Sequence, residues 1–144
     1  MKRTRVVTGT PWEAEVGYAR AVRIGDTIAV SGTVAAGPDG HATADDAYGQ
    51  AREIFRILDG VLRRLGSRLE NVLRLRVHYA DPAIGPGFTR ALKEAFPEGA
   101  PALTGLRVTG LVEPEFLLEV EADAVAGEWQ SQEPPLPEWD EGVD

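Results

Sequence analysis

The sequence contains no cysteine, and this absence excludes disulfide bonds, thiolate metal sites and cysteine nucleophiles. It also lacks any apolar run that approaches the length of a membrane-spanning helix, and its first residues lead into no apolar signal segment. We therefore expect a cytoplasmic protein that does not cross a membrane. The two histidines, His41 and His78, fall in a predicted turn and a predicted strand and form no metal-ligand spacing, so we expect no metal site.

The chain has no excess of basic residues that could form a surface for binding nucleic acid. Six of the 23 acidic residues and none of the 15 basic residues lie between residues 127 and 144. Residues 1–126 therefore carry 17 acidic against 15 basic residues, a net charge of −2, and the rest of the total of −8 belongs to the C-terminal segment. Binding to a phosphate backbone needs a positive stripe. We therefore expect no nucleic-acid partner.

At 144 residues the chain is long enough for one domain with a single core. We place this domain at residues 1–126 and interpret residues 127–144 as an acidic tail that contains prolines and tryptophans. The PPLP sequence of the tail could serve as a polyproline ligand for an aromatic groove. A polar extension that lies over the domain or is partly disordered is the favoured interpretation. An interaction module acting through the tail is one hypothesis for the function.

Hydrophobic periodicity predicts the order strand-strand-helix-strand-helix-strand-strand. Two β-rich runs flank the turn at residues 25–27 and predict a hairpin over residues 17–35. Apolar residues at three- and four-residue spacing predict a long helix that begins with a capping box from Thr43 to Asp46 and ends at Gly66. The remaining predicted elements are a strand over residues 71–81, a helix over 88–96, and strands over 100–110 and 115–125.

Each predicted helix has one apolar stripe, and both stripes need the same sheet face. This pattern predicts an α+β fold in which a single sheet carries two helices on one face. The alternating apolar residues from Leu73 to Tyr79 are expected to point towards the helices. The other sheet face is charged, and we expect it to pack against other copies of the chain. The charged residues expected to pair there are Arg74 and Arg76 with Glu119, Glu121 or Asp123.

Several segments carry a further signal when they are taken in order. They are GYARAVRIGDTIAVSGT, the long helix, LENVLRLRVHYAD, the short helix ending in KEAF, APALT, and LLEVEADAV. Together they resemble the RidA (YjgF-type) reactive-intermediate deaminase family over about residues 17–126. The resemblance implies a chorismate-mutase-like fold assembled as a homotrimer, with small-molecule clefts between subunits and no cofactor. The best-known members hydrolyse short-lived enamines and imines, such as 2-aminoacrylate, to a 2-oxo acid and ammonia.

The resemblance also implies roles for particular residues. Tyr18 matches the cleft tyrosine, Ser31 matches the serine of the family's V-S-G segment, and Gly105 falls where the family places a small cleft residue. Glu119 matches the glutamate associated with activating water, which makes it the candidate catalytic residue. A salt bridge on the charged sheet face is the alternative role for Glu119.

The chain departs from the family at Leu103. The deaminase branch has Pro-Ala-Arg-Ser/Thr here, and its arginine clamps the substrate carboxylate, whereas this chain has PALT at residues 101–104. A bidentate arginine–carboxylate contact contributes about 1.5–3 kcal/mol, so its loss weakens binding about ten- to a hundredfold. Two arginines are candidates to replace it: Arg107, on the same strand face at about 13 Å, and Arg90 in the second predicted helix.

Two functions of the domain therefore remain open. The first is a trimeric protein that binds a small metabolite between its subunits, with doubtful imino-acid deaminase activity because Leu103 replaces the arginine. The second is a cofactor-independent hydrolytic deaminase that acts on C=N bonds, with Glu119 activating water. Because the wall at Leu103 is apolar, a less acidic imine suits this cleft better than a 2-imino acid.

Overall fold

The structure is a computed structural model that describes residues 1–128 and 132–135. Its strands are β1 (Arg3–Val6), β2 (Ala21–Ile24), β3 (Thr27–Thr33), β4 (Val72–Tyr79), β5 (Ala102–Arg107) and β6 (Leu118–Val125). They form one sheet in the order β1-β2-β3-β6-β4-β5, in which β4 and β5 run parallel and all other neighbours antiparallel. The predicted hairpin is β2–β3, and the predicted final pair of strands is separated in the sheet by β4.

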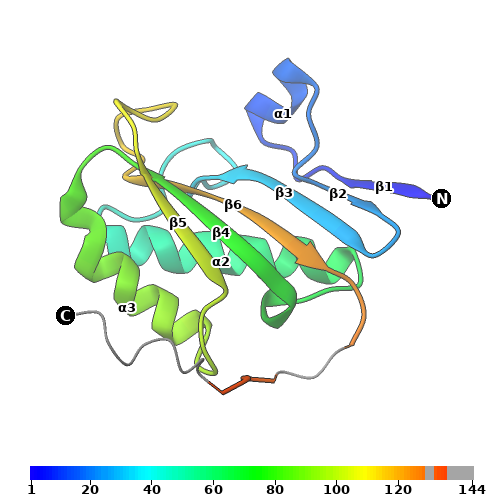
Figure 1. Cartoon of the computed structure of the whole chain (residues 1–144). Coiled ribbons are helices and arrows are strands. Elements are labelled where there is room, and N and C mark those ends of the chain that lie inside the picture. Colours follow the sequence, from blue (N-terminus) through cyan, green and yellow to red (C-terminus); the bar gives the residue numbers. More distant parts are fainter. Residues whose placement is uncertain (129–131, 136–144) are drawn as a thin grey trace.

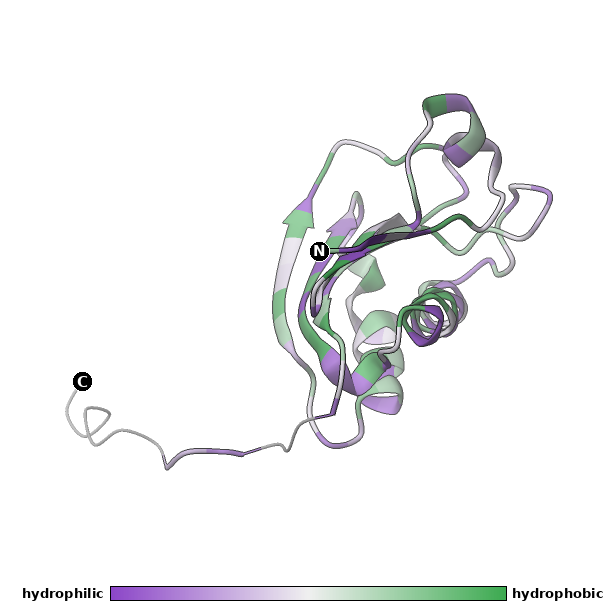
Figure 2. Ribbon diagram, turned by 90° about the vertical axis from the view of Figure 1, so that its right-hand side faces the viewer, coloured by the Kyte–Doolittle hydropathy of each residue, from purple (hydrophilic) through white to green (hydrophobic). Residues whose placement is uncertain are grey.

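The helices are α1 (Pro11–Val16), α2 (Ala47–Arg64) and α3 (Gly85–Ala95), with short 3-10 turns at Leu69–Asn71 and Pro82–Ile84. The last two helices cover one face of the sheet (Figure 1), and the sheet curves around them when seen from the side (Figure 2). The α+β prediction, with one sheet and two helices on one face, is therefore confirmed. The sequence did not predict α1, which lies away from that layer near β2 and β3.

The core lies between the sheet and the two covering helices. Ile54, Leu58 and Leu62 are spaced at one helical turn along α2 and are fully buried. They belong to the same cluster as Leu75 of β4 and Leu118 of β6, which are also fully buried. The amphipathic stripe of α2 thus fixes which face of the sheet is interior and which face is left outside.

The start of α2 differs from the sequence prediction. Its N-cap is Asp46, whose carboxylate accepts a hydrogen bond from the backbone N–H of Gly49 at 2.8 Å. The predicted capping box from Thr43 is wrong, because Thr43 precedes the helix and its hydroxyl donates to the carbonyl of Ala35 at 3.3 Å. The segment between β3 and α2 is consequently longer than predicted.

One residue of β4 faces the other way from its prediction. The register of β4 against β6 shifts between Val72 and Arg74, which is a β-bulge. The shift buries Val72 and turns Leu73 outwards, so that 55% of Leu73 is exposed. The expectation that Leu73 packs against the helices is therefore wrong, because a bulge adds one residue locally and interrupts the alternation that the prediction assumed.

The acidic tail is described only in part. Residues 127–128 and 132–135 are described, whereas both tail tryptophans and the second half of PPLP lie outside the described residues. No helix among residues 1–128 and 132–135 is both long enough and apolar enough to cross a membrane.

Candidate functional site

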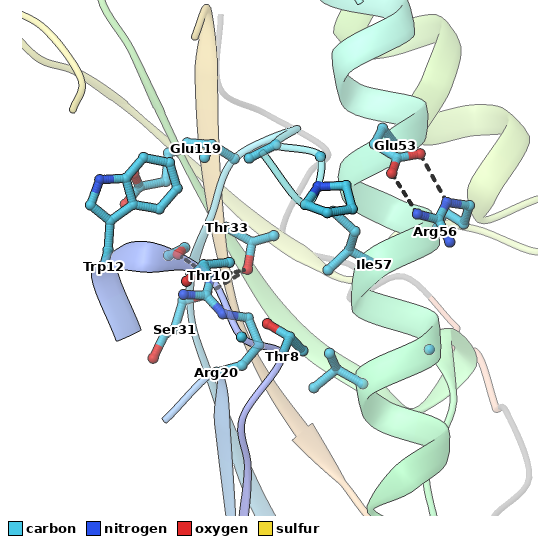
Figure 3. A pocket seen from close by; sticks show the side chains of 18 of the residues that line it. Thr8, Thr10, Trp12, Arg20, Ser31, Thr33, Glu53, Arg56, Ile57 and Glu119 are labelled. Carbon is cyan, nitrogen blue, oxygen red and sulfur yellow. Dashed lines mark hydrogen bonds and ion pairs between the residues drawn. The ribbon is translucent and has the colours of Figure 1, made fainter. Parts of the chain in front are cut away.

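A cavity of about 830 Å³ lies beside the end of β3, next to the segment that carries α1. Its walls are the segment around α1, the end of β3 with the loop that follows, and one side of α2. Three of the predicted site residues, Tyr18, Ser31 and Glu119, line this cavity. In Figure 3, Glu119 lies at one end and the Glu53–Arg56 pair of α2 lies at the other.

Arg20 organises the middle of this cavity. Its guanidinium donates hydrogen bonds to the carbonyl of Gly32 at 2.6 Å, to the hydroxyl of Thr33 at 3.0 Å and to the hydroxyl of Tyr18 at 3.0 Å. Its Cζ atom also lies 5.4 Å from the centre of the Tyr18 ring, and only 5% of the residue is exposed. Arg20 therefore fixes the position of Tyr18 relative to the end of β3.

Glu13 of α1 balances the charge of Arg20. One carboxylate oxygen of Glu13 lies 3.8 Å from Arg20 Nε, and the residue is buried. The carboxylate also accepts four hydrogen bonds, from the backbone N–H and the hydroxyl of both Thr8 and Thr10, at 2.6–3.3 Å. Burial raises the pKa of Glu13, but the hydrogen bonds from Thr10 and Thr8 outweigh it and hold the pKa below 4.5. Glu13 is thus charged at neutral pH and ties α1 to the cavity.

The position of the Glu119 side chain depends on a neighbouring glycine and not on a hydrogen bond. The register of β3 against β6 shifts between Val30 and Thr33, and this irregularity brings Gly32 against the Glu119 side chain. A Cβ atom at position 32 would overlap the carboxyl group of Glu119, so the close approach requires glycine here. Within the described residues, the half-buried carboxylate of Glu119 makes no hydrogen bond or ion pair. It is free to act on a molecule in the cavity.

Two of the ion pairs predicted for the charged face of the sheet are present. Arg76 pairs with Glu121 at 3.0 Å and with Asp123 at 3.3 Å, as predicted. Neither Arg76 nor Arg74 pairs with Glu119 in the part of the chain that the structure describes. In a single copy of the chain, therefore, no ion pair among the described residues supports the alternative role of Glu119 as a salt-bridge partner.

A second cavity, of about 240 Å³, lies at the opposite edge of the sheet, between β5 and the start of α3. Leu103 and Gly105 line it together with apolar residues such as Ile84 and Phe88. The edge strand β5 is exposed along its whole length, and 46% of Leu103 is accessible. Five of the seven predicted site residues are thus divided between two separate cavities of the same chain.

The two arginines proposed to replace the family arginine line neither of these cavities. Arg107 donates from Nε to the carbonyl of Ala80 at 3.3 Å. Arg90 lies over the ring of Tyr48, 4.0 Å from its centre, and its Nε is 3.4 Å from a carboxylate oxygen of Glu94. Within a single chain, therefore, neither guanidinium group occupies the place of the Leu103 side chain.

Sequence reasoning missed Glu13 and Arg20. A signal for α1 was present, since the sequence TPWE at residues 10–13 has the spacing of a capping box, and the structure forms one from Thr10 to Glu13. No local pattern pairs Glu13 with Arg20, because the two side chains meet only after α1 has folded back. The described residues contain no group of three or more histidine and acidic side chains that could hold a metal ion.

Comparisons with known proteins agree with this fold. Residues 8–126 match the family described as Endoribonuclease L-PSP. The uncharacterised protein SCO2049 of Streptomyces coelicolor is 36% identical over 123 residues, which cover 85% of this chain and 92% of that protein. The crystal structure of Rv2704 from Mycobacterium tuberculosis, a member of the YjgF/YER057c/UK114 family, is 34% identical with a TM-score of 0.78, covering 87% of this chain and all of that one.

The crystal structure of yeast Mmf1 is 25% identical with a TM-score of 0.78, and the match covers 88% of this chain and 100% of that one. The family match takes in both cavities, from the threonines beside α1 to the end of β6. The chain therefore belongs to the endoribonuclease L-PSP family, the family of YjgF and RidA.

Proposed function

We propose that this protein binds a small metabolite in clefts between the subunits of a homotrimer. In each cleft, the cavity that holds Glu119 in one copy faces the β5 edge of the next. The observation that carries the proposal is the division of the site: Glu119 lines one cavity and Leu103 lines another. A single chain keeps these two sets of residues apart, whereas a second copy can bring them together.

The exposed edge strand supports an assembly of this kind. Every residue of β5 is exposed, and Leu103 and Leu106 present apolar side chains on it. An exposed apolar edge strand is a surface on which another chain can pack or pair. Covering β5 with a second copy would remove this apolar surface from water and would close the smaller cavity.

Turnover of 2-imino acids is expected to be slow or absent in such a cleft. The cavity wall around Leu103 also contains Val77, Ile84 and Phe88. An apolar wall cannot replace the hydration that a substrate carboxylate loses on binding. Without a bidentate partner the substrate also loses the orientation that hydrolysis needs. The ligand is therefore expected to be a carbonyl or imine compound without a carboxylate next to the reacting carbon.

Hydrolysis of a less acidic imine is the second candidate, and the free carboxylate of Glu119 favours it. Glu119 would take a proton from water while the water oxygen bonds to the C=N carbon, and the π electrons would move to nitrogen. Glu119 would return that proton to nitrogen, which gives a carbinolamine. The hydroxyl proton of the carbinolamine would then pass to nitrogen as the C–N bond breaks, and ammonia and a carbonyl compound would leave.

The family description names an endoribonuclease, and RNA cleavage is the less supported function for this chain. Residues 1–126 carry a net charge of −2, and the acidic tail makes the whole chain more negative. RNA binding draws much of its affinity from neutralising phosphates with lysine and arginine. The cavity that contains Glu119 has the volume of a small-molecule site.

The test is a deaminase assay on 2-aminoacrylate generated in place, with the decaying imine trapped as its semicarbazone. Wild type, Leu103→Arg and the volume-conserving control Leu103→Met would be compared. With wild type and Leu103→Met, we expect 2-aminoacrylate to decay at the uncatalysed rate. With Leu103→Arg, we expect a rate at least tenfold higher. Rapid turnover by wild type would overturn the proposal. In the Leu103→Arg background, Glu119→Gln should abolish the gain, and a retained gain would remove Glu119 from the chemistry.

A further inference from the structure

The cavity that contains Glu119 has a second part, which runs along α2 and which no step of the proposed chemistry uses. Its volume of about 830 Å³ is in the range that encloses drug-sized ligands. A three-carbon imine would leave most of that space empty. Ile57, Gly60 and Val61 of α2 line this part of the cavity, and Figure 3 shows Ile57 with the Glu53–Arg56 pair beyond it. We call this part, lined by residues 53–64 of α2, the α2 arm.

Gly60 has no explanation in the fold itself. It lies inside α2, where glycine weakens a helix relative to alanine. Its φ is not positive, and no atom lies within 4 Å of the place where a Cβ would stand. Neither backbone conformation nor crowding therefore requires glycine at this position. Gly60 is exposed and lines the cavity, so a larger side chain at this position would extend into the α2 arm.

Two arginines lie one helical turn before and one helical turn after Gly60. Arg56 and Arg64 are four residues before and after Gly60, and both line the cavity. Arg56 donates two hydrogen bonds to Glu53, which lower the pKa of that carboxyl and keep it charged. Arg64 forms no ion pair with any residue in the described ranges. The three side chains together carry a net charge of +1, which matches one negative charge on a ligand.

The interior of the cavity contains a buried ion pair and adds no net charge. Arg20 is 95% buried and lines the same cavity, and its Nε has no hydrogen-bond partner among the described atoms. The closest carboxylate oxygen to this Nε, from Glu13, is at 3.8 Å, too far for a hydrogen bond. Because Glu13 offsets the charge of Arg20, the net positive charge that a ligand meets in this cavity is that of Arg64 in the α2 arm.

We propose that the α2 arm is a binding site for an organic monocarboxylate with a flat or compact apolar body. The apolar body would lie on Ile57, Gly60 and Val61, and the carboxylate would accept hydrogen bonds from the guanidinium of Arg64. A dianion such as a phosphate monoester matches the single net charge less well. This site does not require Glu119 or any hydrolysis, so it stands or falls separately from the proposed function.

The test is an NMR titration of the ¹⁵N-labelled full chain with benzoate, with benzamide as the neutral isostere and phenyl phosphate as the dianion. We expect benzoate to shift the amide signals of Gly60 and Val61 in a saturable way. Benzamide and phenyl phosphate should each bind at least tenfold more weakly. Arg64→Gln should raise the Kd for benzoate about tenfold or more, since it removes a charge-assisted contact. Arg63→Gln is the matched control, because Arg63 pairs with Asp59 and does not line the cavity.

Gly60→Leu provides a variant that fills the α2 arm. The open space around position 60 lets the helix accept the side chain, so an unchanged amide spectrum outside the arm is expected, with loss of benzoate binding. Three results would each overturn the proposal: benzoate shifts confined to Ser31, Gly32 and Glu119, an Arg64→Gln variant that binds as wild type does, or benzamide binding as tightly as benzoate. Tighter binding of phenyl phosphate would likewise contradict the monocarboxylate assignment.

Discussion

The two cavities of this chain are built in opposite ways. The cavity that contains Glu119 is held by buried polar contacts, from Glu13 through Arg20 to Tyr18 and the end of β3. The cavity beside Leu103 is apolar and borders an edge strand that is exposed along its whole length. The difference teaches that the polar cavity is formed within a single chain, whereas the apolar cavity lies at an exposed sheet edge, where the proposed function places a second copy.

The largest expected effect is on stability, and it concerns the polar contacts of the cavity that contains Glu119. Arg20→Ala leaves the carboxylate of Glu13 buried without its cation, which typically costs about 3–5 kcal/mol. We expect this loss in the free energy of unfolding, measured by urea denaturation. The exposed i,i+4 pair of Arg63 with Asp59 is the control, and Arg63→Ala should cost about 0.5 kcal/mol or less. Equal costs for the two variants would show that the buried contacts of Arg20 do not stabilise this cavity.

A smaller effect on stability and a large effect on chemistry are expected at Gly32. Gly32→Ala places a Cβ where the Glu119 carboxyl lies, and the end of that side chain can move away. We therefore expect a stability change of about 1 kcal/mol or less. In the Leu103→Arg background, turnover of 2-aminoacrylate should fall about a hundredfold because the carboxylate is misplaced. Gly110→Ala, which meets open space at a position that lines neither cavity, should leave that turnover unchanged. Unchanged turnover in Gly32→Ala would mean that the position of Glu119 is not critical.

The smallest expected effect is in the loop that follows β3. His41 and Glu115 form an exposed pair at 3.2 Å that joins the loop after β3 to the segment before β6. The hydrogen bond to Glu115 raises the pKa of His41 above 6.5. The pair's contribution to stability is therefore fully present below pH 6.5 and is lost as the pH rises through the raised pKa. An NMR titration should give His41 a pKa above 6.5 in wild type and a lower pKa in Glu115→Gln, because the largest of the effects that raise it is removed. The same pKa in both proteins would contradict this pairing.

The sequence allowed most of the fold to be predicted, because alternation and helical spacing report directly on which residues face the core. The hairpin at residues 25–27, the two amphipathic helices and the strand that carries Leu103 were all predicted in the right order. The placement of Leu73 failed because a β-bulge changes the local register without leaving a mark in the hydrophobic pattern.

The candidate site was predictable only in part. Glu119, Tyr18 and Ser31 came from the family resemblance, and the structure brings all three to one cavity. The contact between Glu13 and Arg20 could not be predicted, because it depends on how a six-residue helix folds back on the sheet. The separation of Leu103 from Glu119 could not be predicted either, since it reflects the positions of β5 and β6 in the strand order.

The central claim, that a second copy completes the site, has a direct test because the chain contains no cysteine. Ser31→Cys and Leu103→Cys would be placed in separate, differently tagged chains, co-expressed, and treated with a short bis-maleimide. Any link between the two variants then joins two copies. The account predicts an efficient link for this combination and little or none when Arg63→Cys, on the outer side of α2, replaces Ser31→Cys. No link, or equal linking in the two combinations, would contradict the claim.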